Sequence, residues 1–354
     1  MGDKGMVIKV AIAEDHEEYI TRLINGLEKY NELNLSLYTE RASLEKALTT
    51  KKFDILLFNP ALYDGQVSLP KSTLAVLLAD ESENIPESCR EFCRVKKYQR
   101  ISSIYRNLLD LYSDVCSNVS VNGGNYTRKI VFYSPIGGSG KTSIALAAST
   151  QLAMIGKSVL YVNFEDIPSD ACYLPQKNTD KGMSELLAYM GTDVNFSMKL
   201  QGLAHSKMDK FYYLNHFSSP NDIYEMTSEE IEELLTLIGN TGLYDYIVID
   251  TETALNDKKK VMFECADKII IINNSGVIAN EKIKCFMSQT HILNEYKHKM
   301  LEVHNLTWQG SMFENTGLPV IDVIEKIQNA SVEKTISIIA AQNVKRLTNT
   351  LMNV

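Results

Sequence analysis

The residues best suited to chemistry lie in the segment KIVFYSPIGGSGKTS, residues 129–143, where an apolar run leads into a glycine-rich turn and then a helix. Glycine tolerates backbone angles that a Cβ forbids, so such a turn can direct several N–H groups at one anion. The dipole of the following helix adds partial positive charge there. The segment predicts a phosphate-binding loop, whose expected nucleotide-binding residues are Gly137, Gly138, Ser139, Gly140, Lys141, Thr142 and Ser143.

Two side chains of this loop and one distant carboxylate predict ATP and Mg²⁺ as cofactors. Lys141 can reach the β- and γ-phosphates, and the hydroxyl of Thr142 is placed to bind Mg²⁺. The apolar run DYIVID, residues 245–250, ends in a carboxylate, and we expect Asp250 to hold Mg²⁺ through water. The alternative is a plain strand-end acid. The loop departs from the usual pattern at Pro135, five residues before Gly140, where a glycine is normal.

Apolar runs around the loop predict the sheet that positions it. A helix is expected at 141–155 and an acidic helix at 228–238. Further strands are expected at 158–164, 211–217, 268–274, 301–305 and 318–324. Together with the run that enters the loop, these segments fit a nucleotide-binding domain with a mainly parallel sheet.

The first part of the chain predicts a separate α/β domain. Strands are expected at 7–13, 35–40, 54–58, 74–79 and 92–97, and helices at 17–30, 43–50 and 102–112. This alternation favours a parallel sheet covered on both faces, with a flavodoxin-like strand order. The expected fold class is therefore α/β, with two three-layer α/β/α domains. The predicted domains are residues 1–113 and 129–354, joined by a polar linker at 114–128.

The composition of the chain favours a cytoplasmic protein over a secreted or membrane-spanning one. The chain has 354 residues, 45% of them apolar and 23% charged, which is enough to form two cores. No apolar run is long enough to span a bilayer, and the first residues lack a secretory apolar region, so we expect a cytoplasmic protein. Six scattered cysteines without a CxxC pair are expected to be reduced thiols. A net charge of −8 argues against DNA as a partner.

The first domain resembles response-regulator receiver domains. Glu14 and Asp15 follow the first strand, where that family holds Mg²⁺, and Lys96 follows the fifth strand, where it keeps a lysine. The position of the phosphoacceptor aspartate holds Asn59, a far poorer nucleophile, and Ala79 replaces the switch hydroxyl. The resemblance implies a receiver fold that no longer takes phosphate and serves as a docking or dimerising surface. The alternative is an unrelated small α/β domain with solvated charges.

The second domain resembles the MinD/ParA group of P-loop ATPases, whose signature is KGG-x-GK-[ST]. The chain has IGGSGKTS, so Ile136 replaces the lysine that in this group reaches the phosphates bound by a partner subunit. The group's Asp-x-Asp pair is replaced by Asn163 and Glu165. Glu165 remains the candidate catalytic residue that positions water, with disturbed geometry. Loss of a charge aimed at the transition state costs about 100-fold or more. The resemblance implies tight ATP·Mg²⁺ binding with slow or negligible hydrolysis.

A receiver-like domain before a deviant MinD/ParA ATPase is the arrangement of the TadZ/CpaE group. This resemblance implies a cytoplasmic homodimer, at a cell pole or on the inner face of the membrane, that recruits the pilus and secretion machinery of the Tad (Flp) system. Two alternatives stay open. One is an active MinD/ParA-type ATPase that positions cargo on membrane or nucleoid DNA, and the other is a receiver-type signalling regulator.

Three further features bear on the partners and ligands of the chain. The segment 332–354 has apolar residues near helical spacing, which favours a helix packed on its own domain over one in contact with membrane. Residues 258–260 form a run of lysines, expected to be a solvated loop or else a partner or DNA contact. Asn305 and Pro319 lie at expected strand ends, where the superfamily often surrounds adenine.

Overall fold

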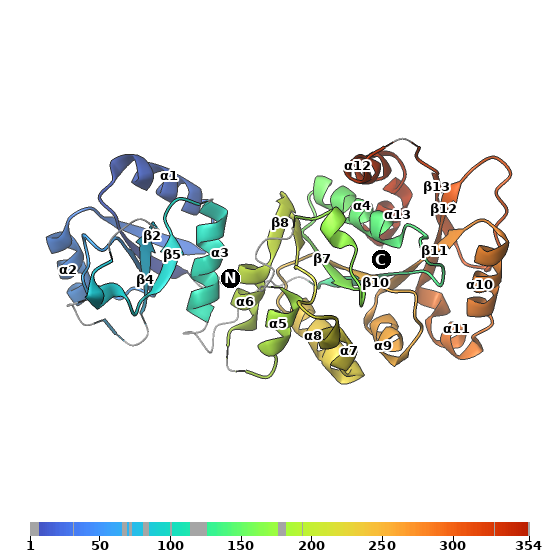
Figure 1. The fold of residues 1–354 in the computed structure, drawn as a ribbon, viewed down its shortest axis with the longest axis horizontal. Coiled ribbons are helices and arrows are strands. Elements are labelled where there is room, and N and C mark those ends of the chain that lie inside the picture. The colour runs from blue at the N-terminus through green and yellow to red at the C-terminus, as the bar shows by residue number, and fades with distance from the viewer. Residues whose placement is uncertain are drawn as a thin grey trace, which may run out of the picture. The chain divides into compact units, whose positions relative to one another are not determined.

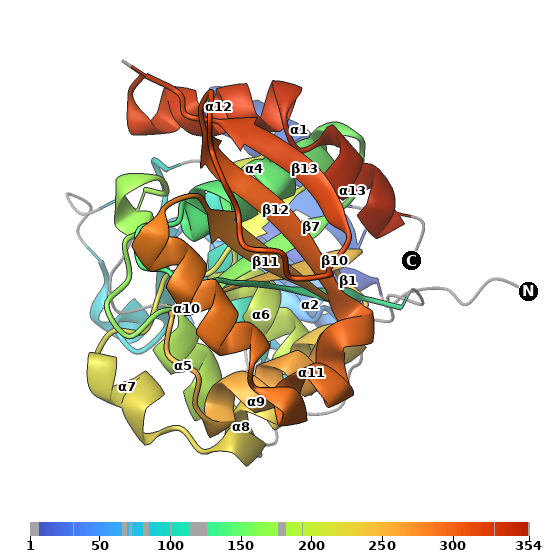
Figure 2. The same cartoon turned by 90° about the vertical axis from the view of Figure 1, so that its right-hand side faces the viewer.

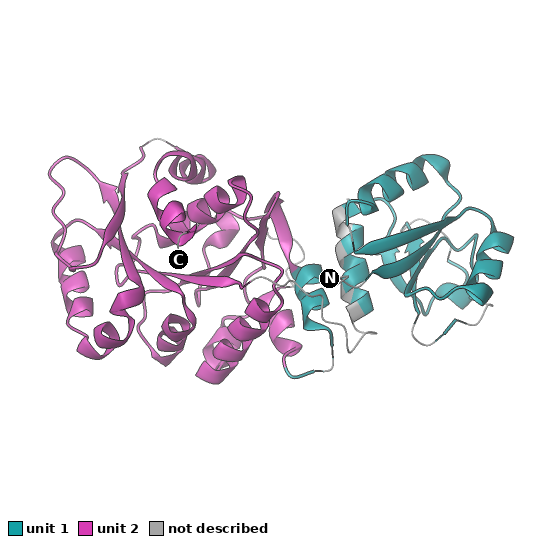
Figure 3. Cartoon of the chain, turned by 180° about the vertical axis from the view of Figure 1, so that it is seen from behind, with its two compact units in different colours: residues 1–122, 191–203 teal, residues 123–190, 204–354 magenta. Residues whose placement is uncertain are grey.

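The chain forms two compact units in a computed structural model (Figure 3). Unit 1 comprises residues 1–122 and 191–203, and unit 2 comprises residues 123–190 and 204–354. The structure describes residues 7–30, 32–65, 69–70, 73–80, 85–99, 101–113, 126–175, 182–192, 194–328 and 330–352. Residues 114–125 of the expected linker lie outside the described residues. Residues 191–203 belong to unit 1, although the sequence analysis assigns them to the second domain.

Unit 1, drawn mostly from blue to teal in Figure 1, contains a parallel sheet. Its five strands have the order β2-β1-β3-β4-β5. This order confirms the expected flavodoxin-like α/β fold. Each strand begins and ends within two residues of the segment expected for it. Their bounds are β1 Ile8–Ala13, β2 Leu33–Tyr38, β3 Ile55–Phe58, β4 Leu74–Ala79 and β5 Cys93–Lys96.

The helices of unit 1 cover both faces of this sheet. Val10 and Ile12 of β1 pack toward α1 (Glu17–Leu27) and α3 (Ile101–Ser113), whereas the alternate residues Ala11 and Ala13 pack toward α2 (Arg41–Thr50). A short 3₁₀ helix, η1 (Glu87–Cys89), precedes β5. Helix α6 (Phe196–Leu203) packs on α3 and adds Met198 to the same core.

Unit 2 contains an eight-stranded sheet with the order β13-β12-β11-β6-β10-β7-β9-β8. All neighbouring pairs are parallel except β8 with β9, which confirms the expected mainly parallel sheet. The strand bounds are β6 Arg128–Tyr133, β7 Val159–Phe164, β8 His205–Met208, β9 Phe211–Tyr213, β10 Tyr246–Thr251, β11 Lys268–Asn274, β12 Met300–Thr307 and β13 Val320–Glu325.

Helices lie on both faces of the second sheet (Figure 2). Helix α4 (Lys141–Met154) packs with α12 (Val332–Gln342) and α13 (Lys345–Met352) on one face. Alanines make α4 narrow, so much of it can be buried between the sheet and α12. The remaining helices are η2 Asp170–Cys172, α5 Met183–Ala188, α7 Pro220–Glu225, α8 Ser228–Asn240, α9 Asp257–Cys265, α10 Val277–Met287, α11 Thr290–Tyr296 and η3 Lys297–Lys299.

Two local features of this sheet differ from what the sequence predicts. The expected strand 211–217 ends at Tyr213, and residues 214–217 continue as a loop. Strand β8 is short and polar, with no apolar run to mark it, and its antiparallel pairing with β9 makes a hairpin at the sheet edge. Strand β9 pairs with β7, and β8 lies beyond β9 as the edge strand.

The C-terminal segment is packed against its own unit. The apolar side chains of α13, Leu347 and Leu351, are fully buried in the core that contains α4. This packing leaves no apolar face of α13 open for a membrane surface. Of the helices in the described part of the chain, none has the length and apolar character needed to cross a bilayer.

Candidate nucleotide-binding site

The predicted phosphate loop connects β6 to α4 at the carboxyl edge of the parallel sheet. Ser134 anchors it, because its hydroxyl donates to the carbonyl of Ile272 (2.6 Å) and accepts from the N–H of Ile136 (3.1 Å). Gly138 and Gly140 have φ values of 68° and 84°, in the left-handed region that favours glycine. The loop therefore has the backbone shape that glycine permits, as the sequence predicts.

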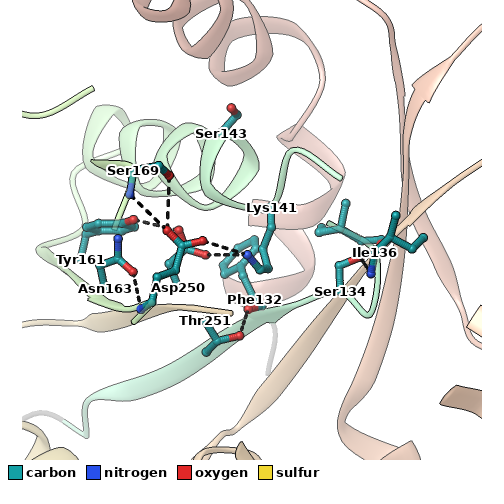
Figure 4. Close-up of polar contacts among 12 residues, drawn as sticks. Phe132, Ser134, Ile136, Lys141, Ser143, Tyr161, Asn163, Ser169, Asp250 and Thr251 are labelled. Carbon is teal, nitrogen blue, oxygen red and sulfur yellow. Dashed lines mark hydrogen bonds and ion pairs between the residues drawn. The ribbon is translucent and has the colours of Figure 1, made fainter. Parts of the chain in front are cut away.

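Lys141, the first residue of α4, lies between two carboxylates (Figure 4). Its Nζ is 3.3 Å from Glu165 Oε1 and 3.8 Å from Asp250 Oδ1. Charge-assisted hydrogen bonds are normally 2.7–2.9 Å long, so neither contact is a close pair. The ammonium is therefore buried between two carboxylates, but its ion pairs with them are long, so it can still bind a phosphate.

Asp250 is fully buried at the end of β10, as the sequence predicts for the strand-end carboxylate. The hydroxyl of Tyr161 donates to Oδ2 (2.9 Å), whereas Oδ1 accepts no hydrogen bond. Burial raises the pKa of Asp250 to about 6, and Lys141, Thr142 and Tyr161 oppose that rise. A buried carboxylate oxygen without a donor, beside a threonine hydroxyl, fits a hard cation such as Mg²⁺.

The other predicted loop residues divide into two groups. Thr142 is buried beside Lys141, and its hydroxyl is near enough to Asp250 to oppose the rise in the pKa of that carboxylate. Ser143 points away from Lys141, and its hydroxyl lies 3.3 Å from that of Tyr173 (Figure 4). The Oγ of Ser139 is buried and has no hydrogen-bond partner among the described residues. Ser139 and Thr142 are therefore the hydroxyls best placed for a phosphate and its metal.

Glu165 follows β7 and is fixed by its neighbours. Its N–H donates to Asn163 Oδ1 (2.8 Å), and its Oε2 accepts from the N–H (3.4 Å) and hydroxyl (3.3 Å) of Ser169. The other oxygen, Oε1, faces Lys141. The carboxylate predicted to position water is therefore held by Ser169 on one side and by the lysine on the other.

Ile136 occupies the signature-lysine position and is 8% exposed. Its side chain lies apart from the contacts that join Lys141 to the carboxylates (Figure 4). An apolar side chain carries no charge for a phosphate. The loop therefore offers one lysine, Lys141, where the resembling group has two.

Asn305 and Pro319 lie at opposite edges of the sheet. Asn305, near the carboxyl end of β12, donates from Nδ2 to the carbonyl of Ser139 (2.7 Å), so its amide supports the phosphate loop. Pro319 immediately precedes β13, and its carbonyl accepts from the N–H of Glu302 (2.9 Å). Because β12 and β13 are parallel, Pro319 lies at the amino edge, away from the loop. Of the two residues expected near adenine, Asn305 is the one that contacts the phosphate loop.

The lysine run at 258–260 is not a solvated loop, because these residues are in α9. Lys258 donates to the carbonyl of Ile223 (2.6 Å), and Lys260 pairs with Asp257 (2.8 Å). Lys259 is buried on the inner face of the helix with Met262 and Phe263. This spacing of i, i+3 and i+4 is the signal from which sequence reasoning could have found it.

Unit 1 has its own group of polar residues at the carboxyl end of its sheet. The buried lysine there is Lys97, not Lys96 as expected, because Lys96 is exposed on β5. Lys97 Nζ lies 3.0 and 2.8 Å from the two carboxylate oxygens of Glu14. Asn59 donates to Glu14 (3.2 Å) and Asp15 (3.4 Å). The acids thus pair with the protein's own donors.

No group of three or more His, Cys, Asp or Glu side chains suited to a metal ion occurs among the residues that the structure describes. Mg²⁺ beside the phosphate loop would therefore take only Thr142 and Asp250 from the protein. Its other ligands would be nucleotide phosphates and water, which is usual for this ion. The residues present fit a metal that arrives with its nucleotide.

Comparisons with known proteins agree with this geometry. A family model described as AAA domain matches residues 127–303, half of the chain. No curated protein matches the chain.

Solved structures of MinD and ParA proteins share the fold. The septum site-determining protein MinD of Pyrococcus horikoshii, in complex with Mg-ADP, is 18% identical, with a TM-score of 0.50 over 64% of this chain and 96% of its own. The MinC:MinD cell division complex of Aquifex aeolicus gives 17% identity and a TM-score of 0.53 over 64% and 97%. A ParA family ATPase of Chlorobium tepidum gives 16% and 0.50 over 65% and 98%. These likenesses show a MinD/ParA-like P-loop NTPase fold.

Proposed function

This chain belongs to the AAA domain family, and on that premise we propose that it binds ATP·Mg²⁺ and acts as a nucleotide-dependent positioning factor with weak or absent hydrolysis. In this proposal residues 129–354 are the nucleotide-binding domain and residues 1–113 a receiver-like domain, joined by a linker at 114–128. The Pyrococcus horikoshii relative of similar fold carries Mg-ADP, which is consistent with the ligand proposed.

The single observation that carries the proposal is the state of Lys141. Its ammonium is buried at a helix N-terminus and a glycine turn, with its two carboxylate neighbours at 3.3 and 3.8 Å. A phosphate there would gain the ammonium, the backbone N–H groups and the helix dipole together. Asp250 and Thr142 would hold the Mg²⁺ that bridges the phosphates.

Slow hydrolysis follows from what surrounds Lys141. Ile136 cannot supply the second charge that the resembling group directs at the phosphates. Glu165 is bonded to Ser169 and faces Lys141, so it is less free to orient an attacking water. When nucleotide is bound, the protein residues would orient the phosphates and exclude water more than they would move a proton.

We propose a homodimer formed through the carboxyl edge of the second sheet. Large apolar side chains are exposed there: Ile167 after β7 (86%), and Val277 and Ile278 at the start of α10 (88% and 76%). Exposed apolar groups around a charged site are typical of an interaction surface. Bound ATP would neutralise that edge and favour the contact with a second copy.

The cellular role proposed is that of the TadZ/CpaE group, in which a cytoplasmic scaffold at a cell pole or on the inner face of the membrane recruits Tad pilus and secretion proteins. Support comes from the flavodoxin-like unit 1, whose Asn59 stands where a receiver needs a phosphoacceptor. The Aquifex aeolicus relative was solved with MinC, which supports a protein partner for this fold. An active MinD/ParA-type ATPase remains the competing function.

Light scattering after gel filtration tests the proposal. The full chain is run with ATP·Mg²⁺, with ADP·Mg²⁺ and without nucleotide, and the bound nucleotide is then identified by chromatography. We expect a doubled mass with ATP alone and ATP recovered intact after an hour. Unchanged mass with no bound nucleotide would reject the proposal. Rapid turnover stimulated by DNA or by anionic vesicles would support the active ATPase instead.

A further inference from the structure

A hollow of about 330 Å³ lies near the amino ends of β1 and β2 in unit 1. This is the opposite edge of the sheet from Glu14, Asn59 and Lys97. The hollow is formed by β1, β2 and the connection from α2 to β3, and its lining residues are Lys9, Asn34, Ser36, Lys51, Lys52 and Phe53. Its volume is at the lower end of the range typical of small-ligand pockets, so a small ligand can enter it.

The strand register places three of these side chains on one face of the sheet. Side chains alternate along a strand, and Ala11 and Ala13 of β1 pack toward α2, so Lys9 lies on the same face. Lys9 pairs with Asn34 of β2, and Ser36 follows on that face. Lys9 is the only exposed residue of β1, whose other five residues are buried. Helix α2 therefore covers the sheet beyond Lys9 but leaves the face open at the hollow.

Five of the lining side chains can donate hydrogen bonds, and among the described residues no carboxylate lines the hollow. The five donors are Lys9, Asn34, Ser36, Lys51 and Lys52. No hydrogen bond or ion pair joins their side chains to another residue that the structure describes. The acid next in sequence, Asp54, accepts from the backbone N–H of Lys9 (2.7 Å). The hollow thus gathers donors and positive charge.

The dipole of α2 explains only part of this charge. Lys51 and Lys52 follow the carboxyl end of α2, where cations are favoured. That end carries about half an elementary negative charge, far less than three ammonium groups bring. It gives no reason for a third lysine on β1, since lysine is depleted in strands. Three ammonium groups around one hollow repel one another, and a bound polyanion would replace that repulsion with attraction.

We propose that this hollow binds a small soluble anion that carries two or more phosphate groups. One phosphate group has a charge of about −1.5 to −2, which leaves part of the charge of three lysines uncompensated, whereas a di- or triphosphate compensates it. Lysine binds phosphate as a point charge, and Asn34 and Ser36 can donate to further oxygens. The anion would join the α2–β3 connection to β1 and β2. Unit 1 would then respond to a bound phosphate compound, although Asn59 occupies the expected phosphoacceptor position.

Lysine acetylation followed by mass spectrometry tests this on the full chain. Acetic anhydride is applied with and without about 1 mM inorganic tripolyphosphate, at about 0.15 M salt to screen weak surface attraction. We expect acetylation of Lys9, Lys51 and Lys52 to slow by about threefold or more, and orthophosphate to protect them less. Lys46, exposed on α2 outside the hollow, is the internal control and should react at an unchanged rate.

Substitution of one lysine shows whether the three act together. Lys9→Gln should restore fast acetylation of Lys51 and Lys52 in tripolyphosphate, because two ammonium groups hold the anion less strongly, whereas Lys46→Gln should equal the wild type. Thermal unfolding confirms that both variants fold. Lys141→Met, which changes the phosphate loop of unit 2, should keep the protection.

Four results would overturn the proposal. One is the absence of protection by tripolyphosphate, and another is equal slowing at Lys46, which would show screening alone. Protection that persists in Lys9→Gln, or that is lost in Lys141→Met, would place the binding elsewhere. Vesicles of phosphatidylserine should not protect these lysines. Protection by vesicles without protection by tripolyphosphate would assign them to a membrane surface and also contradict the proposal.

Discussion

Both units bury lysines near carboxylates at the carboxyl edge of a parallel sheet, but the two arrangements differ in how completely the charges are paired. In unit 1, Lys97 is 2.8 Å from Glu14, and Glu14 also accepts from Asn59 and two backbone N–H groups. In unit 2, the nearest carboxylate oxygen to Lys141 Nζ is 3.3 Å away, on Glu165. A closely spaced ion pair stabilises its own unit, whereas a lysine at longer distances from its acids can gain more from binding an anion.

Breaking the paired site should have the largest effect on stability. Lys97→Met leaves the carboxylate of Glu14 buried and uncompensated, so unit 1 should lose about 3–5 kcal/mol of stability. Hydrogen exchange of β1 and β5 measures it, because local opening reports the stability of that unit. The control Lys96→Met, exposed at the last residue of β5, should change exchange by much less than Lys97→Met. Equal effects of the two variants would remove the contrast between the units.

A backbone change in the phosphate loop should come next. A Cβ at Gly140 would lie 2.4 Å from Asn305 Nδ2, at a φ of 84°. Gly140→Ala should therefore destabilise unit 2 by about 2–3 kcal/mol and abolish ATP uptake, through left-handed strain and displacement of the Asn305 amide. Urea unfolding followed by Trp308, the only tryptophan, reports on this unit. Gly137→Ala, where no atom lies within 4 Å of the added Cβ, is the control.

The double variant Gly140→Ala with Asn305→Ala separates the two causes. Removing the amide relieves the close contact but not the backbone strain, so it should recover part of the loss. No recovery would mean that Asn305 does not limit the space beside the loop.

The smallest expected effect on stability comes from the half-paired carboxylate of Asp322, and this effect depends on pH. Asp322 accepts from the N–H of Leu347 (2.8 Å), and burial raises its pKa to about 6. Between pH 4 and 6 the folded chain keeps a proton that the unfolded chain has lost, so stability falls as pH rises through this window. Asp322→Asn should reduce that slope, leaving the part due to Asp250, and stabilise unit 2 by about 1–2 kcal/mol at pH 7. Trp308 fluorescence in urea at pH 4.5 and 7 measures it, and an unchanged slope would contradict it.

Much of the fold could be predicted, because apolar runs in the sequence mark most of the strands and helices. The β1 pattern divides its side chains between two cores, and the run entering the glycine turn places Lys141 at the sheet edge. The short hairpin of β8 and β9 could not be predicted, because polar strands of this length have no apolar pattern. The sequence analysis named Lys96 as the site lysine, but the buried lysine is its neighbour Lys97. Side chains alternate between buried and exposed here, and the sequence does not show which of two adjacent lysines points inward.

The sequence could not predict which lysines are buried and which form ion pairs. Lys258, Lys259 and Lys260 are identical in type, and only the face of α9 that each occupies separates them. The same limit applies to Asn305, whose bond to Ser139 depends on the close approach of β12 to the loop. Residue types indicated the phosphate loop, but the balance of charge around it required the packed structure.

Calorimetric titration of ATP·Mg²⁺ into the full chain and into Lys141→Met tests the central claim most directly. An underpaired ammonium in a ring of N–H groups should give the wild-type chain micromolar or tighter affinity, and its loss should weaken binding by about 100-fold. Wild-type heat that does not saturate at about 1 mM ATP, or equal affinity in Lys141→Met, would contradict the account.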